Sequence, residues 1–293
     1  MTINNANPTP SVWKTMWREI YRDPLALFGL IVFVGIVITV YIWAWRIDSE
    51  AAMRMNLLFR NNEPGPGHLL GFDSMGRDML TQLILAARNS LTISFAVTIP
   101  GAAIGITLGL FMGFYGGHVD NVGMRLIALW SMIPGMMLII VLRQMFTPGV
   151  MGFVLLMLVV SGWLTMTGTV RVMAFGQRSL DYVSASKTMG TPNIVIMFRE
   201  VFPNLISIIT SGLTLVLASN MAMETGLTFL GFGLPPGTPS LGRLIAYARS
   251  PFTMQNRMYQ WLPAALLVFI MMLCINFIGQ ALNRAADAKK RRG

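Results

Sequence analysis

Long apolar runs, each closed by charged residues, alternate with short polar segments along most of the chain. Six runs contain no charged residue, at 25–45, 89–115, 126–142, 144–170, 201–223 and 258–283. Each is close to or above the length that a helix needs to cross about 30 Å of hydrocarbon. The shortest, 126–142, would need flanking side chains that reach the interface. The pattern therefore predicts an all-α membrane protein with six transmembrane helices.

A seventh uncharged run, 225–242, has a different pattern. It contains Pro235, Pro236 and Pro239 together with several glycines, which argue against a continuous helix. Broken backbone at membrane depth is tolerated only against protein or a wet cavity. We therefore expect this run to be irregular and not to form another span.

Small residues recur at regular spacing inside the run 89–115. The glycines concerned are Gly101, Gly105, Gly109 and Gly113. A spacing of four places them on one helical face, where two helix backbones can approach closely. We predict a packing face here. Pro100 precedes the series and favours a kink, because proline removes a helical hydrogen bond.

The lysines and arginines orient the predicted spans. With the N-terminus inside, the inner segments hold more of these residues than the outer segments, and the basic tail supplies much of the excess. Cytoplasmic segments are enriched in lysine and arginine, so both ends and segment 171–200 are expected in the cytoplasm. The chain then divides into a cytoplasmic N-terminal segment (1–24), a first transmembrane helix (25–45), an external segment (46–88), a core domain with five spans (89–283) and a basic cytoplasmic tail (284–293).

Composition agrees with a membrane protein and argues against other classes. Of 293 residues, 54% are hydrophobic and only 12% are charged, whereas soluble domains carry about 25% charged residues. We interpret the net charge of +10 as an orientation signal, with no nucleic acid as partner. Cys274 is the only cysteine, and His68 and His118 are the only histidines, so no metal site is expected. No phosphate-loop motif occurs, and we expect no ATP binding by this chain.

Segment 181–203 interrupts the apolar pattern with charged residues, one glycine and two prolines. Leu180, Val183 and Met189 can share one side of a first helix. Gly190 follows, and a glycine tolerant of positive φ is a common helix stop. The pattern predicts a short helix that ends at Gly190.

A second short helix is predicted after this glycine. Thr191 can cap it and Pro192 suits its first position, where the missing N–H costs nothing. Pro203 marks the entry to the next span. Two such helices can dock on a soluble partner, or they can lie in the lipid headgroups. The pattern alone leaves both interpretations open.

The same segment resembles the cytoplasmic signature of permeases from binding-protein-dependent ABC importers. That signature runs Glu-Ala-Ala, three residues, Gly, nine residues, then Ile-x-Leu-Pro. Ala185, Gly190 and Pro203 match it in register. The departures are Ser184 for the glutamate, Ser186 for the second alanine and Glu200 for the isoleucine. The missing carboxylate at the first position puts in doubt any ion pair that the family makes there.

Four further segments extend the resemblance over nearly the whole chain. They are 71–91, 115–138, 227–245 and 278–289. The first looks like a Gly-Thr-Asp-x-x-Gly-Arg-Asp motif of the dipeptide and oligopeptide permease subfamily, with Phe72 in place of threonine. Together the segments resemble the second, C-type membrane subunit of that subfamily.

The resemblance implies a transport subunit without its own enzymatic activity, in a bacterial inner membrane. It implies pairing with a homologous permease, two cytoplasmic ATPase subunits that hold ATP and Mg²⁺, and an external substrate-binding protein that delivers peptide. This chain would bind no cofactor. Nickel or another small solute is the alternative substrate. The residues that would couple to the ATPases are Asp181, Ser184, Ala185, Lys187, Gly190, Thr191, Pro192, Phe198, Arg199 and Pro203.

Other residues are candidates for external or pathway contacts. Asp73, Arg77 and Asp78 precede the second span, where they either form a charge-satisfied helix start or contact an external partner. Pro134 either kinks a pathway helix or packs as an ordinary kink. Glu224 is expected to be a solvated helix end, with contact to a substrate amine in a central cavity as the alternative.

Two rival functions have less support in the sequence. A membrane-embedded enzyme would need a nucleophile and a base at one depth, and no such set is visible. A self-sufficient channel or secondary transporter would favour an internal repeat, and none is convincing. The basic tail can also hold anionic membrane lipid.

Overall fold

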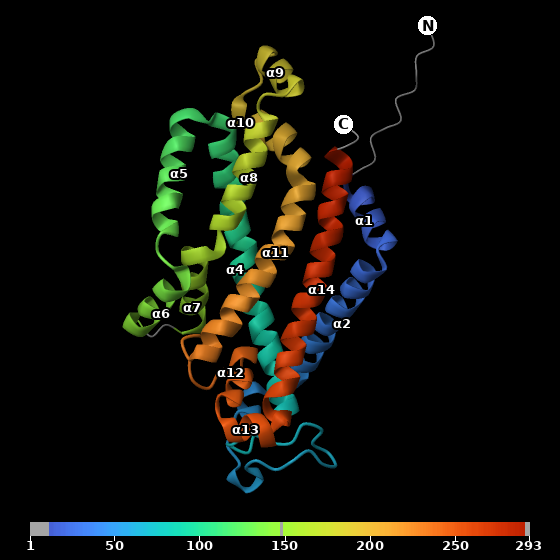
Figure 1. Cartoon of the computed structure of the whole chain (residues 1–293), viewed down its shortest axis with the longest axis vertical. Coiled ribbons are helices and arrows are strands. Elements are labelled where there is room, and N and C mark those ends of the chain that lie inside the picture. The colour runs from blue at the N-terminus through green and yellow to red at the C-terminus, as the bar shows by residue number, and fades with distance from the viewer. Residues whose placement is uncertain (1–11, 147–148, 291–293) are drawn as a thin grey trace.

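A computed structural model describes residues 12–146 and 149–290 of the chain. Within these residues the fold is helical, apart from the isolated bridges Gly65–His68 and Phe72–Asp78. Figure 1 shows long helices that run side by side, with shorter helices at both ends of the bundle. The expectation of an all-α protein is confirmed over the described residues.

Five helical stretches are long and apolar enough to cross a membrane. They are α2 (Pro24–Arg46), α4 (Met79–Tyr115), the stretch Val150–Gln177, the stretch Asn193–Leu230 and Met258–Ala286 within α14 (Met258–Lys290). A sixth crossing is complete only if the bent pair α5 (Gly117–Ser131) and α6 (Gly135–Phe146) counts as one span, since these helices meet at 68°. The chain is thus a multi-pass membrane protein with five or six spans.

The other elements connect these stretches or make up the two composite ones, Val150–Gln177 and Asn193–Leu230. At the N-terminal side they are α1 (Val12–Arg22), α3 (Ser49–Ala52) and the 3₁₀ turn η1 (Leu57–Phe59). The middle of the chain holds α7 (Val150–Met157), the π-helical η2 (Leu158–Gly162), α8 (Leu164–Gln177), α9 (Asp181–Thr188), α10 (Asn193–Ile196), the π-helical η3 (Met197–Val201) and α11 (Phe202–Leu230). Near the C-terminal side lie α12 (Leu241–Ile245), η4 (Ala246–Arg249) and α13 (Pro251–Asn256).

The predicted third span begins too late in the sequence. It was placed at 126–142, but the helix α5 already starts at Gly117 and includes two charged residues, Asp120 and Arg125. Asp120 forms an ion pair with Arg171 of α8. Because the two charges neutralise each other between the helices, Arg171, which bounded the run 144–170, lies inside α8.

The fifth span is also longer than predicted. It was placed at 201–223, but α10, η3 and α11 form one continuous stretch from Asn193 to Leu230. Gly231 then takes the left-handed conformation, with φ 93°, and ends the helix. The proline-rich part of the run 225–242 is irregular, as expected, but its first residues belong to α11.

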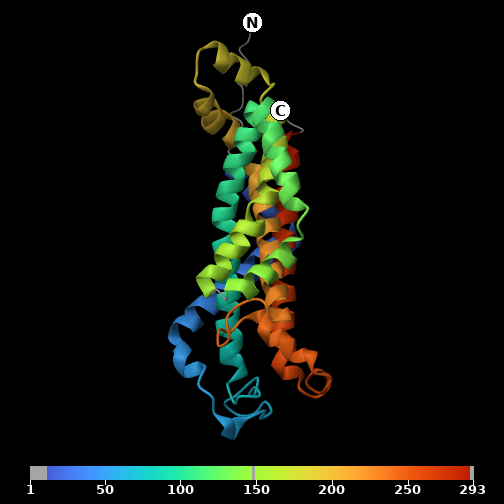
Figure 2. The same ribbon diagram turned by 90° about the vertical axis from the view of Figure 1, so that its left-hand side faces the viewer.

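The two ends of the bundle carry different elements. Figure 1 places α1, α9 and the C-terminal end of α14 at one end, and α12, α13 and the loop before α4 at the other. Figure 2, turned by 90°, shows the same separation. Helices α2, α4, α11 and α14 each run from one end to the other. We call the end with α12 and α13 the loop end.

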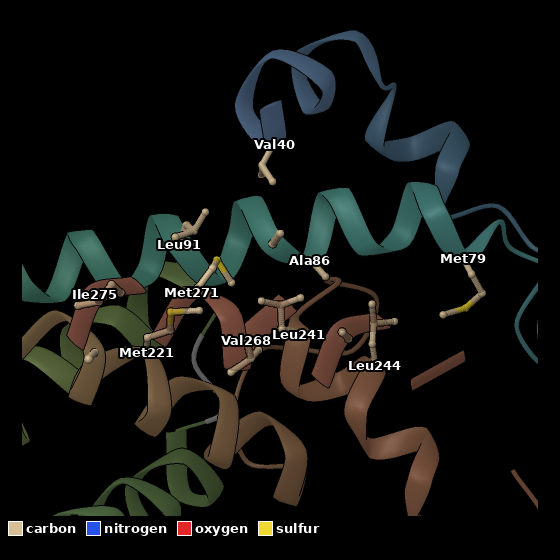
Figure 3. Close-up of a cluster of buried hydrophobic side chains, with 13 residues drawn as sticks. Val40, Met79, Ala86, Leu91, Met221, Leu241, Leu244, Val268, Met271 and Ile275 are labelled. Carbon is tan, nitrogen blue, oxygen red and sulfur yellow. The ribbon is translucent and has the colours of Figure 1, made fainter. Parts of the chain in front are cut away.

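Buried apolar side chains from several helices pack together inside the bundle. Leu91 of α4, Met221 of α11, Leu241 of α12 and Met271 of α14 meet in one buried cluster (Figure 3). Within a membrane such contacts stabilise the bundle through van der Waals packing, because lipid tails are as apolar as leucine.

The glycine spacing in α4 is explained by its contact with α8. A Cβ at Gly105 would lie 2.6 Å from the carbonyl oxygen of Trp163, and one at Gly109 would lie 2.7 Å from that of Thr167. Real Cβ atoms do not approach so closely, so only glycine permits this backbone contact. The predicted packing face is confirmed.

Candidate functional site

Helix α9 and the turn after it protrude from one end of the bundle. Gly190 has φ +80°, and a Cβ there would meet open space. Its N–H donates to the Lys187 carbonyl at 3.0 Å, while that of Thr191 reaches the Ser186 carbonyl at 3.1 Å. Left-handed backbone is strained for residues with a Cβ. The predicted helix stop at Gly190 is confirmed.

The second half of the segment differs from the prediction. Pro192, and not Thr191, occupies the position before α10, and no side chain caps this helix. The helix does not stop before Pro203 but passes through η3 into α11. Proline lacks an N–H and clashes with the carbonyl four residues before it. A π-helical turn widens the helix at this point, so the chain continues without a break.

The predicted apolar side of the first helix is only partly buried. Val183 has no exposed surface, whereas Leu180 is 42% and Met189 77% exposed. Ile194 and Phe198 are exposed as well. We call Leu180, Met189, Ile194 and Phe198 the exposed apolar face of the segment. An apolar face of this kind requires cover from lipid or from a protein partner.

Most of the predicted coupling residues are accessible. The exposed ones are Asp181, Ser184, Ala185, Lys187, Gly190, Pro192, Phe198 and Arg199, and Thr191 and Pro203 are partly buried. Lys187 places its ammonium 5.0 Å from the ring centre of Phe114, at the end of α4. This cation–π contact holds the side chain against the bundle.

Two departures from the family signature contact each other. The Ser186 hydroxyl lies 2.8 Å from each carboxylate oxygen of Glu200. Ser186 is buried on α9 and Glu200 belongs to η3. The hydroxyl donates one charge-assisted hydrogen bond, which ties α9 to the helical stretch that enters the bundle. Sequence comparison with the signature marks both positions as unusual but does not reveal that they pair.

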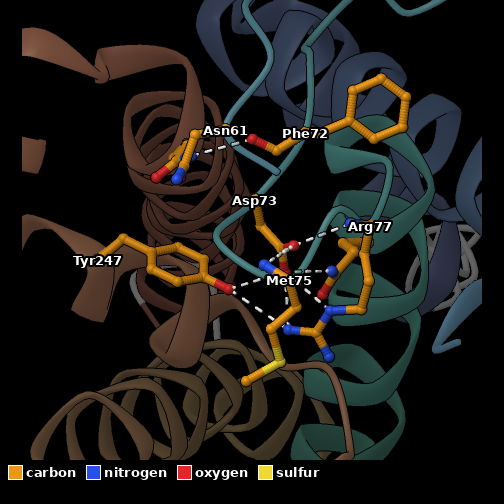
Figure 4. Close-up of polar contacts among 8 residues, drawn as sticks. Asn61, Phe72, Asp73, Met75, Arg77 and Tyr247 are labelled. Carbon is orange, nitrogen blue, oxygen red and sulfur yellow. Dashed lines mark hydrogen bonds and ion pairs between the residues drawn. The ribbon is translucent and has the colours of Figure 1, made fainter. Parts of the chain in front are cut away.

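The residues before α4 form a closed polar cluster at the loop end (Figure 4). Asp73 is fully buried, and its carboxylate accepts from the Met75 N–H at 2.8 Å, Arg77 Nε at 2.8 Å, Gln82 Nε2 at 2.9 Å and the Tyr247 hydroxyl at 3.1 Å. Burial and the charge of Asp73 raise the pKa of Tyr247 to about 12. The bonds to Asp73 thus fix the loop before α4 onto η4.

Asp78 acts as the cap of α4. Its carboxylate accepts from the Thr81 N–H at 2.8 Å and contacts His68 Nδ1 at 3.0 Å. Burial tends to raise the pKa of Asp78, but the hydrogen bonds from Thr81 and His68 outweigh it and hold the pKa below its usual range. This geometry supports the interpretation of Asp73, Arg77 and Asp78 as a charge-satisfied helix start.

Glu224 is not a solvated helix end, contrary to expectation. It lies inside α11 with no exposed surface. Its carboxylate accepts from the hydroxyls of Ser240 at 2.8 Å and Thr228 at 3.0 Å. Ser240 precedes α12, so the bond attaches the irregular loop after α11 to that helix. A buried carboxylate needs hydrogen-bond partners, and these hydroxyls supply them. The sequence pattern had placed this carboxylate at the membrane edge.

Pro134 lies in the break between α5 and α6 and is exposed. The end of α5 is held by Trp130, whose Nε1 donates to the Val160 carbonyl in η2 at 3.0 Å. The break therefore faces the π-helical turn of the next span. Irregular backbone at this depth is expected where helices meet protein or a cavity.

Comparison with known proteins supports the resemblance. The family model of the binding-protein-dependent transport system inner membrane component matches residues 105–292. A second model, the N-terminal TM domain of oligopeptide transport permease C, matches residues 11–56.

Curated relatives match nearly the whole chain. The oligopeptide transport system permease protein OppC of Lactococcus lactis subsp. cremoris is 38% identical over 291 residues, which cover 99% of each chain. AmiD of Streptococcus pneumoniae, an oligopeptide transport system permease protein, is 30% identical over 97% of this chain and 92% of its own. The dipeptide transport system permease protein DppC of Bacillus subtilis is 28% identical over 97% of this chain and 88% of its own. The chain belongs to the family of binding-protein-dependent transport system inner membrane components.

Proposed function

We propose that this protein is a membrane subunit of an ATP-driven importer of peptides in a bacterial inner membrane. The observation that carries the proposal is the 38% identity, over 99% of both chains, with a relative named as an oligopeptide transport permease. The dipeptide permease name of another full-length relative points to the same substrate class. The chain would enclose half of the pathway and pair with a homologous permease.

The end of the bundle that carries α9 would lie in the cytoplasm. The excess of lysine and arginine in the segments at this end supports that orientation. Both termini would then be cytoplasmic, and the loop end would face an external binding protein. The basic residues Arg291 and Arg292, which contribute to the orientation, lie outside the described residues.

The exposed apolar face of 181–203 would dock on the cytoplasmic ATPase subunits. The helical stretch Asn193–Leu230 runs from this face to the loop end without interruption. Ser186 and Glu200 join α9 to that stretch. Movement of the docked segment would therefore shift α11 as a stiff lever, and the pathway would open alternately to the two sides. ATP and Mg²⁺ would be bound by the ATPase subunits.

Transport by the reconstituted complex tests this function. Vesicles would contain this chain, its homologous permease and the ATPase subunits, with the external binding protein added outside. We expect labelled oligopeptide to accumulate when ATP is inside and not with a non-hydrolysable analogue. Accumulation of nickel in place of peptide would assign the alternative substrate. Peptide entry that ignores ATP would contradict an ATP-driven importer.

A further inference from the structure

A pocket of about 460 Å³ opens among α3, α4, the start of α7 and the loop after α11. Ligand pockets in proteins commonly enclose about 300–1,000 Å³, so the volume suits a small molecule. Much of the lining is apolar and includes Leu85, Ile93 and Val150. Two charged side chains, Arg88 and Glu50, also line it. Neither belongs to the predicted coupling or pathway residues.

Arg88 presents a cation to the pocket without an anion beside it. Its Nε and Nη2 donate to Oδ1 of Asn89 at 3.3 and 3.1 Å. In residues 12–146 and 149–290 no carboxylate forms an ion pair with it. A guanidinium carries five N–H donors in a rigid fork that matches a carboxylate. A charged residue within a membrane-spanning helix is costly, and such residues commonly mark a substrate or ion pathway.

Asn89 makes the site rigid. Its side-chain oxygen accepts from Arg88, while its Nδ2 donates to the Pro239 carbonyl at 2.8 Å. The Leu241 N–H donates to the Ser90 hydroxyl at 3.2 Å, one residue further along α4. These bonds fix the loop that forms one wall of the pocket. A ligand would thus meet a prepared cavity and would lose less free energy to ordering of the protein.

Glu50 adds a negative charge to the pocket that Arg88 lines. It lies in the first turn of α3, is exposed and, within the described part of the chain, forms no ion pair. An apolar chamber with a carboxylate and a guanidinium on its walls matches a zwitterion with an apolar body. A short peptide has that chemistry: an ammonium at one terminus, a carboxylate at the other and side chains between them.

We propose that this pocket binds a short zwitterionic peptide, with its terminal carboxylate at Arg88 and its terminal ammonium at Glu50. The inference rests on the proposed peptide transport and names a contact for that substrate at the loop end. Asn89 is a positioning residue, since it holds Arg88 and the pocket wall. A zwitterionic phospholipid offers the same pair of charges, and the experiments separate the two ligands.

The first experiment compares uptake of one short peptide with its C-terminal amide and its N-acetyl form in the reconstituted complex. Arg88→Gln is expected to lower uptake of the free acid by about tenfold, or about 1.4 kcal/mol, and to leave uptake of the amide unchanged. Glu50→Gln is expected to lose only the preference for the free amine. Arg46→Gln is the control, because Arg46 is an arginine at the end of α2 that does not line the pocket.

The same binding protein delivers substrate to every variant, so its own selectivity cancels in the comparison. If Arg88→Gln and the wild type prefer the free acid over the amide to the same degree, the assignment of the carboxylate contact is refuted. Loss of the partner permease from purified Arg88→Gln complex would also refute it, because the arginine would then serve assembly.

The second experiment needs no transport. Thr92 lines the pocket and is exposed, so Thr92→Cys in a Cys274→Ser background reports occupancy through its rate of thiol labelling. We expect free peptide, and not its amide, to slow labelling of the assembled complex, and Arg88→Gln to abolish the protection. Protection by phosphatidylethanolamine and not by peptide would identify a lipid site and overturn the proposal. If peptide protects but is not transported, the pocket stands and the proposed function fails.

Discussion

Gly190 sets the angle between α9 and the helix that enters the bundle. Its φ of +80° is open to glycine and strained for most other residues, yet the space around it is empty. A substitution here therefore tests backbone geometry alone. A Cβ added here would meet no neighbour, and the membrane-spanning helices lie elsewhere in the fold.

Gly190→Val is expected to strain or rearrange the turn at a cost of about 1–2 kcal/mol. The protein should reach the membrane at normal levels but retain less ATPase subunit on purification, or hydrolyse ATP without uptake. Gly176→Val is the control, because Gly176 is also exposed with free space around it and has no positive φ. Normal assembly and transport by Gly190→Val would show that α9 is an ordinary headgroup helix.

Tyr247 provides a test of the cluster around Asp73. Its pKa of about 12, against an ordinary 10.0, means that the folded protein holds the phenolic proton more tightly than the unfolded chain does. This contribution to stability is complete below pH 10 and is lost as pH rises toward 12. The tyrosinate absorbance difference between wild type and Tyr247→Phe should therefore titrate near pH 12. A midpoint near pH 10 would contradict a buried hydroxyl at Asp73.

At the scale of the element, polar partners allow charged residues to lie inside helices. Asp120 and Arg171 pair between α5 and α8, so both charged residues lie inside helices although they fall outside the uncharged runs. The carboxylate of Glu224 has hydroxyl partners, so α11 continues past it. In the sequence pattern, a charged residue marks the boundary of a predicted span. In the fold, a charged residue that has an ion-pair or hydrogen-bond partner does not end a helix.

Removal of one member of the α5–α8 pair should destabilise the fold. Asp120→Asn would leave Arg171 without its anion, at a cost of about 3 kcal/mol, and should lower the thermal unfolding midpoint of the purified protein. The double substitution Asp120→Leu with Arg171→Leu removes both charges and should restore most of the midpoint. Equal losses in the single and double variants would indicate that the ion pair contributes nothing beyond packing.

The amino-acid pattern predicted the frame of the whole molecule and the glycine packing face of α4, but it missed the polar contacts between elements. Apolar runs located the helices, because burial in lipid demands them, and the helix stop at Gly190 followed from backbone sterics. The positions of Asp120 and Glu224 inside helices were missed, because their partners Arg171 and Ser240 lie elsewhere in the sequence. The bond between Ser186 and Glu200 and the pocket at Arg88 depend on how helices meet, which periodicity does not encode.

At the scale of the whole molecule, an importer subunit must receive the ATPase at one end of the bundle and face outward at the other. Met189 and Leu69 are apolar side chains with similar exposure, 77% and 74%, on the segment 181–203 and in the loop before α4 respectively. They therefore form a matched pair of positions. Once both positions carry the same photoreactive residue, reactivity and accessibility are alike, and only the end of the molecule differs.

Site-specific photo-cross-linking from these two positions in intact cells tests the central claim most directly. A photoreactive residue in place of Met189 should cross-link to an ATPase subunit, and one in place of Leu69 should not. The yield from position 189 should fall in a Gly190→Val background, where α9 meets its partner at a different angle. Cross-links from position 189 to lipid alone, or to an external protein, would contradict the proposed coupling and the orientation of the chain.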